Sequence, residues 1–189
     1  MRAAAQQTRR RAVASVIVLV LCFVFFKGCF SSPTSESANT KPVPVQEQRD
    51  AYTAWYAEVG KKLKTGDDTM KIISELLVGY SKGGYDRYGA YSVAKACYDN
   101  IDALWQYLIN VKPPANLSAE HKKTLTEGID AIQTAQYERR AGLIALMEFF
   151  NSPSPSKLEA TSTHFTTANS FLVDGVAKVV GTEISLGVR

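Results

Sequence analysis

Residues 91–108, YSVAKACYDNIDALWQYL, decide the fold class of this chain. Apolar side chains recur along this segment every three or four residues. This spacing places them on one face of an α-helix of about five turns. Pro113-Pro114 then ends the helix, because the residue before a proline disfavours helical backbone. The predicted core face consists of Tyr91, Ala94, Tyr98, Ile101, Trp105 and Leu108.

Helical spacing continues on both sides of this segment. Upstream, we expect two short helices separated by Gly66, with Asp67 or Asp68 capping the second. Downstream, Ser118 is expected to cap a fourth helix. A capping box of Ser156 and Glu159 starts a fifth, which Gly181 ends. Short breaks between long amphipathic helices favour antiparallel neighbours. The sequence therefore predicts an all-α, up-and-down bundle of four to five helices over residues 46–181, with 182–189 as an unassigned tail.

The N-terminal segment has a different character from the bundle. Residues 1–11 end in three arginines, and residues 12–26 are an uncharged run that is apolar apart from Ser15. Extended to residue 30, this run spans about 28 Å as a helix, close to the roughly 30 Å of a hydrocarbon core. Residues 12–30 are therefore predicted to be a transmembrane or signal segment. The positive-inside bias places residues 1–11 in the cytoplasm and the bundle outside. Residues 31–45, rich in Ser, Thr and Pro, form a disordered linker.

Three fates of this N-terminal segment stay open. It is retained as a signal anchor in the inner membrane, or it is cleaved and the domain released, or it is processed as a lipoprotein. Gly28 before Cys29 resembles a lipobox, although Phe26 and Lys27 differ from that pattern. The resemblance implies lipidation of Cys29 and a lipid-anchored protein.

The charge is concentrated in the same N-terminal segment. The net charge is +4, but residues 1–30 hold five basic residues and no acid. Residues 31–189 hold 17 basic and 18 acidic residues, so the predicted domain carries −1. A domain without excess positive charge is a poor nucleic-acid binder, and we expect no such partner.

No motif indicates an enzyme, a metal site or a cofactor. His121 and His164 are expected on different helices, without metal-ligand spacing. No phosphate-binding loop or nucleophile elbow is present. Cys97 is the sole cysteine of the domain, so we expect a small buried side chain rather than a disulfide.

Residues 80–91, YSKGGYDRYGAY, combine four tyrosines with three glycines. Tyrosine and arginine are enriched in binding surfaces. We therefore predict an interaction surface at Lys82, Tyr85, Arg87 and Tyr88. In the alternative, Gly83-Gly84 simply makes a turn and the tyrosines begin the core face of the next helix.

Gln136 and Arg139 interrupt the apolar face of the fourth helix. One interpretation is a buried polar layer in which Asp99 or Asp102 pairs with Arg139. In the other, the Arg139 stem covers the core and its guanidinium reaches water.

These features favour a membrane-tethered, extracytoplasmic module that binds another envelope protein, on the periplasmic side of a bacterial inner membrane. Its role would be that of a scaffold, an exclusion or immunity factor, or an envelope-assembly factor. The alternative is a helical sensor domain that binds a small ligand, and an enzyme of unknown type comes third.

Overall fold

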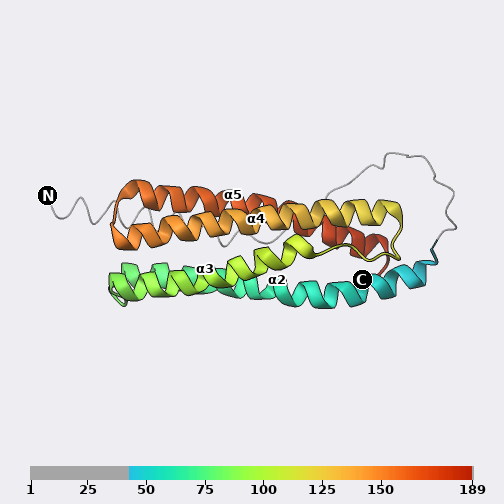
Figure 1. The fold of residues 1–189 in the computed structure, drawn as a ribbon, viewed down its shortest axis with the longest axis horizontal. Helices are drawn as coiled ribbons and strands as arrows, with labels where there is room; N and C mark the ends of the chain where they lie inside the picture. The colour runs from blue at the N-terminus through green and yellow to red at the C-terminus, as the bar shows by residue number, and fades with distance from the viewer. Residues whose placement is uncertain (1–42, 189) are drawn as a thin grey trace.

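The computed structural model describes residues 43–188, which form an elongated bundle of antiparallel helices (Figure 1). Its helices are α2 (Val45–Ser81), α3 (Arg87–Asn110), α4 (Ala119–Asn151) and α5 (Pro155–Ser185). This part of the chain contains no strand, which confirms the all-α prediction with four helices. The predictions for residues 1–42, including the basic segment, the segment 12–30 and most of the linker, lie outside the described residues. Among the described helices, none has the length and apolarity needed to cross a membrane.

The predicted break at Gly66 is wrong, because α2 runs through it without interruption. Gly66 is buried against α3, and a Cβ added there would lie 2.6 Å from Leu104 Cδ2. The missing side chain thus lets α3 approach α2, and this packing outweighs the roughly 1 kcal/mol by which glycine disfavours a helix. Asp67 consequently lies within the helix rather than at a cap.

The ends of the other helices follow local hydrogen bonding. Ser118 caps α4 as predicted, since its side chain accepts from the backbone N–H of His121. The predicted start of α5 is displaced: Ser154, not Ser156, is the N-cap, and Pro155 occupies the first turn, where its missing N–H costs nothing. The helix also continues past Gly181 to Ser185. Leu186 just beyond it is fully buried, so the predicted tail contributes to the core.

The buried apolar side chains form two clusters along the bundle axis. The first joins all four helices and includes Tyr52, Leu108, Leu125, Leu172 and Leu186. The second joins α2, α3 and α4. Its members are Ile73, Leu76, Ala90, Ala94, Cys97, Ile101, Leu143, Leu146 and Phe150.

The core face of α3 is rotated slightly from the predicted one. Ala94, Ile101 and Leu108 are buried as expected, as is Cys97. The three large aromatic residues of the predicted face, Tyr91, Tyr98 and Trp105, are only half-buried. The neighbouring Ala90, Cys97 and Leu104 are buried instead. Small side chains on the inner face let α3 pack closely, while the polar tips of the aromatic rings stay near solvent.

Candidate functional site

The turn between α2 and α3 lies at one end of the bundle, together with the α4–α5 turn; we call this the far end (Figure 1). Its glycines have a structural explanation. Gly83 has φ 80°, a conformation that favours glycine. The N–H groups of Gly83 and Gly84 donate to the carbonyls of Tyr80 and Gly79 at 3.1 and 2.9 Å. This is a Schellman motif, which satisfies the last carbonyls of α2.

Asp86 completes the turn, because its carboxylate accepts from the backbone N–H of Gly89 at 2.7 Å and so caps α3. Tyr85 is partly structural as well. Its ring lies over Gly79, where an added Cβ would come within 2.7 Å of Tyr85 Cε2. The ring is 42% exposed, with one face against α2.

Lys82, Arg87 and Tyr88 are the residues of the predicted surface that the fold does not explain. All three are exposed, and Tyr88 has 80% of its area in solvent, the largest value of any large hydrophobic residue described. Neither Lys82 nor Arg87 forms an ion pair within residues 43–188. Lys82 and Tyr85 thus lie on the turn and Arg87 and Tyr88 at the start of α3, with Tyr88 the more exposed of the two tyrosines.

The opposite end, which we call the near end, consists of the start of α2, the segment 111–118, the start of α4 and the end of α5. Polar contacts tie these parts together. The Gln48 side-chain oxygen accepts from the Ser118 N–H at 2.9 Å and lies 3.1 Å from His121 Nδ1. The other ring nitrogen of His121 lies 3.0 Å from Ser185 Oγ. The Tyr52 hydroxyl donates to the Val179 carbonyl at 3.0 Å, and Arg49 donates to the Leu186 carbonyl.

Gln136 and Arg139 are both buried, between the two apolar clusters. Arg139 Nη1 donates to Gln136 Oε1 at 3.3 Å, and Arg139 Nη2 lies 3.6 Å from Asp67 Oδ1. Burial lowers the pKa of the Arg139 guanidinium, and the Asp67 carboxylate opposes this change. Gln136 and Arg139 therefore form a buried polar layer, and the acid nearest to Arg139 is Asp67 of α2, whose side chain is exposed.

The two aspartates expected to pair with Arg139 have other partners. Asp99 is exposed and pairs with Lys95 at 2.9 Å on the same helix. Asp102 pairs with Arg140 at 2.7 Å. The guanidinium of Arg140 also lies 4.2 Å from the centroid of the Trp105 ring. The expectation failed because it treated Gly66 as a helix end; the unbroken α2 instead carries Asp67 to the polar layer.

The described residues include two histidines, His121 and His164, and one cysteine, Cys97. No group of three or more His, Cys, Asp and Glu side chains that could hold a metal ion occurs among them. His164 Nδ1 lies 2.7 Å from Glu138 Oε2, linking α5 to α4. Burial raises the pKa of the Cys97 thiol to about 11, so it is protonated and a poor nucleophile at neutral pH.

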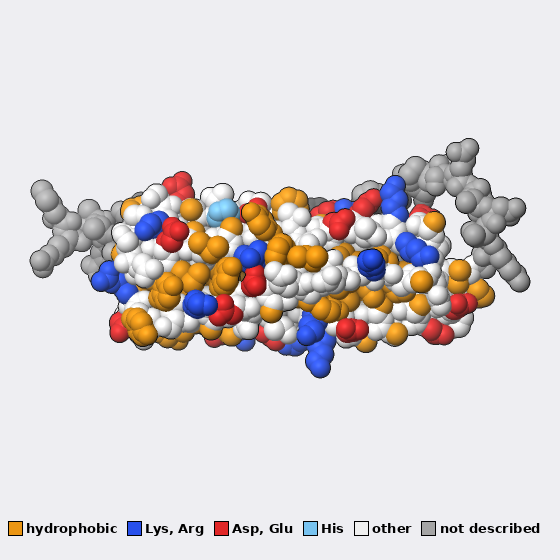
Figure 2. All heavy atoms as spheres, in the orientation of Figure 1, with side chains coloured by type: hydrophobic (Ala, Val, Ile, Leu, Met, Phe, Trp, Pro, Cys, Tyr) orange, Lys and Arg blue, Asp and Glu red, His pale blue; other side chains and the backbone are white. Residues whose placement is uncertain are grey.

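Charges on the surface are mixed rather than segregated. On the face shown in Figure 2, acidic and basic side chains alternate along the bundle, with apolar side chains between them. This face therefore presents no continuous basic strip of the kind that follows a phosphate backbone.

The described residues thus form a four-helix up-and-down bundle. Exposed tyrosine and arginine side chains lie where α2 turns into α3. Comparisons with protein-family models, with curated proteins and with solved structures gave no match.

Proposed function

We propose that this chain is a membrane-tethered helical rod that binds another envelope protein through its far end. The observation that carries the proposal is the separation of the two ends. The described chain begins at the near end, and α2 has 37 residues. At 1.5 Å per residue, it places the α2–α3 turn about 55 Å away. With a tether in residues 12–30, the far end, where this turn and the α4–α5 turn lie, would be the end of the bundle opposite to the one at which the chain enters.

The chemistry of the turn favours a protein partner. Tyr88 offers a large exposed ring with a polar tip, and Arg87 and Lys82, which form no ion pair within residues 43–188, offer cations at the same end of the bundle. Aromatic and arginine side chains supply much of the affinity at protein interfaces. The complementary surface would carry acidic groups around an apolar depression that accepts the Tyr88 ring. A scaffold, an exclusion or immunity factor, or an envelope-assembly factor would each use such a contact.

The tether is tested by fractionation of the full-length chain, which should pellet with membranes and resist carbonate extraction. Intact mass then distinguishes the forms of the tether. Lipidation predicts a mature chain starting at Cys29, with processing blocked by Cys29→Ser and unaffected by Cys22→Ser. A signal anchor predicts a mass that includes Met1. Full-length, unprocessed chain in the soluble fraction contradicts the tether.

The binding surface is tested by Tyr88→Ala and Arg87→Ala. Each should leave the melting temperature almost unchanged and weaken partner binding, since truncation of a hot spot costs about 2 kcal/mol or more, roughly thirtyfold in affinity. Tyr137→Ala is the matched control, because Tyr137 is a 55% exposed tyrosine on α4. Full binding by both far-end variants would move the interface elsewhere on the bundle.

A further inference from the structure

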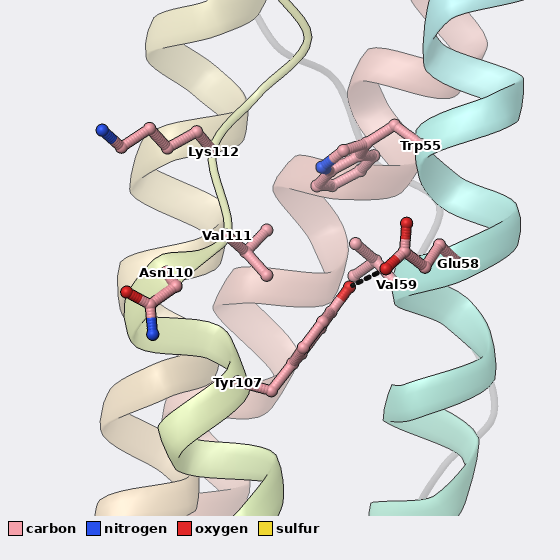
Figure 3. A pocket seen from close by; sticks show the side chains of 7 residues that line it. All are labelled: Trp55, Glu58, Val59, Tyr107, Asn110, Val111 and Lys112. Atoms are coloured by element: carbon pink, nitrogen blue, oxygen red, sulfur yellow. Dashed lines mark hydrogen bonds between the residues drawn. The ribbon is translucent and has the colours of Figure 1, made fainter.

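A hollow of about 310 Å³ opens between α2, the end of α3 and the segment that follows α3 (Figure 3). Its walls include the rings of Trp55 and Tyr107 and the side chains of Val59 and Val111. Figure 3 shows both rings projecting from their helices toward the space between them, whereas Lys112 and Asn110 extend away from it. The volume lies at the lower end of the range for small-ligand sites.

Two charged residues line this hollow, the acid Glu58 and the base Lys112, whose side chain extends away from it in Figure 3. Glu58 Oε1 accepts from the Tyr107 hydroxyl at 3.5 Å, the outer limit of a hydrogen bond, so the carboxylate retains capacity for a stronger donor. Burial, followed by the nearby Glu58 charge, raises the pKa of Tyr107 and keeps its hydroxyl protonated. The ring of Tyr107 already attracts a cation, since Lys62 Nζ lies 5.6 Å from its centroid.

One hydrogen-bond donor in the wall is unused. Trp55 Nε1 is buried and has no hydrogen-bond partner within residues 43–188. An unpaired buried donor is unfavourable and calls for an acceptor that residues 43–188 do not supply. In Figure 3 the indole nitrogen is directed toward the side of Val111 and Lys112.

We propose that this hollow binds an α-ammonium group with an adjacent carbonyl oxygen and an apolar side chain. Glu58 would pair with the ammonium, which would also lie beside the Trp55 ring in a cation–π contact, since Lys62 already lies over the Tyr107 ring. The indole N–H of Trp55 would donate to the carbonyl oxygen. Val59 and Val111 would enclose the apolar side chain. A free apolar amino acid and the first residue of a peptide both carry this chemistry.

The site is tested by NMR on the full-length, ¹⁵N-labelled chain in detergent micelles. The chain has two tryptophans and so two indole N–H signals, which Trp55→Phe assigns. Titration with phenylalanine should shift the Trp55 signal saturably and leave the Trp105 signal in place. Glu58→Gln should weaken binding at least about tenfold, the loss expected from one charge-assisted hydrogen bond. Glu75→Gln, an exposed acid on the same helix, is the matched control and should have no effect.

Analogues distinguish the source of the ligand. Tighter binding of the dipeptide Phe-Gly than of phenylalanine indicates a peptide N-terminus, and the reverse indicates a free amino acid. The amine-free analogue 3-phenylpropionate should not bind. An equal shift with 3-phenylpropionate, undiminished affinity in Glu58→Gln, or no saturable shift of the Trp55 signal overturns the proposal. Because the hollow lies away from the far-end turn, these outcomes are independent of binding through Tyr88.

Discussion

The two ends of the bundle differ in how their side chains are used. At the near end, side chains of Gln48, Tyr52 and His121 bond across to other helices. At the far end, the polar contacts of the α2–α3 turn stay within the turn and the adjoining ends of its helices, as in the Schellman motif and the Asp86 cap. The near-end contacts hold four separate segments together, whereas the far-end contacts shape one turn. The side chains of Lys82, Arg87 and Tyr88, which take no part in these contacts, can therefore be changed with little effect on the fold, which suits a binding surface.

At the far end, removing a buried ring should lower the free energy of unfolding far more than removing an exposed ring. Phe150 is fully buried beneath it, within the second apolar cluster, and its ring contacts Tyr80 at a centroid distance of 4.9 Å. Phe150→Ala should lower the free energy of unfolding by about 3–5 kcal/mol, through lost burial and the cavity left behind. Tyr88→Ala should change it by less than about 0.5 kcal/mol. Urea unfolding followed by circular dichroism compares the two variants, and equal losses would mean that the turn is part of the core.

Two glycines of α5, both toward the near end, should differ in how substitution by alanine changes the stability of the fold. At Gly175 an added Cβ would lie 2.6 Å from Ile132 Cγ1 and 2.7 Å from the Gly128 carbonyl oxygen, where α5 crosses α4. Gly175→Ala should therefore destabilise the fold by about 1–3 kcal/mol. At Gly181 an added Cβ meets nothing within 4 Å. Gly181→Ala should raise stability by up to about 1 kcal/mol. Thermal unfolding of the two variants tests this prediction. A higher melting temperature for Gly175→Ala than for Gly181→Ala would contradict the close crossing of α4 and α5.

The contact between Arg139 and Asp67, which lies between the two apolar clusters, should contribute less to the free energy of unfolding. Arg139 is buried, but Asp67 has 68% of its side chain exposed, so solvent weakens their attraction. A double-mutant cycle of Arg139→Met with Asp67→Asn should give a coupling of about 1 kcal/mol or less. The matching cycles with Asp99→Asn and Asp102→Asn should give none. Coupling of Arg139 to Asp99 or Asp102, with none to Asp67, would reverse the assignment of the layer.

Much of the fold could be predicted from the sequence because the apolar spacing of α3 and the Ser118 cap are local signals. The errors arose where tertiary packing overrides them. Gly66 looks like a helix end, but it is the point where Leu104 packs against α2. That single error also hid Asp67 as the partner of Arg139.

The candidate site was only partly accessible to sequence reasoning. Composition indicated the tyrosine–glycine turn. Which of its side chains are structural and which are free to bind a partner could be decided only from the structure, because the packing of Tyr85 on Gly79 depends on how α2 ends. The hollow beside Trp55 was missed, since its walls come from residues about 50 positions apart and share no motif.

The proposed function requires that the partner binds the far end of the bundle and not the near end. Photo-crosslinking in native membranes distinguishes the two ends, with a photoreactive phenylalanine analogue placed in the full-length chain at Tyr88 or at Ile184. Ile184 is the matched position, because it is 62% exposed at the end of α5 near the start of the described chain. We expect one discrete crosslinked protein from position 88, lost when Arg87→Ala is added, and none from position 184. A discrete crosslink from position 184, with none from position 88, would show that the partner binds the near end instead.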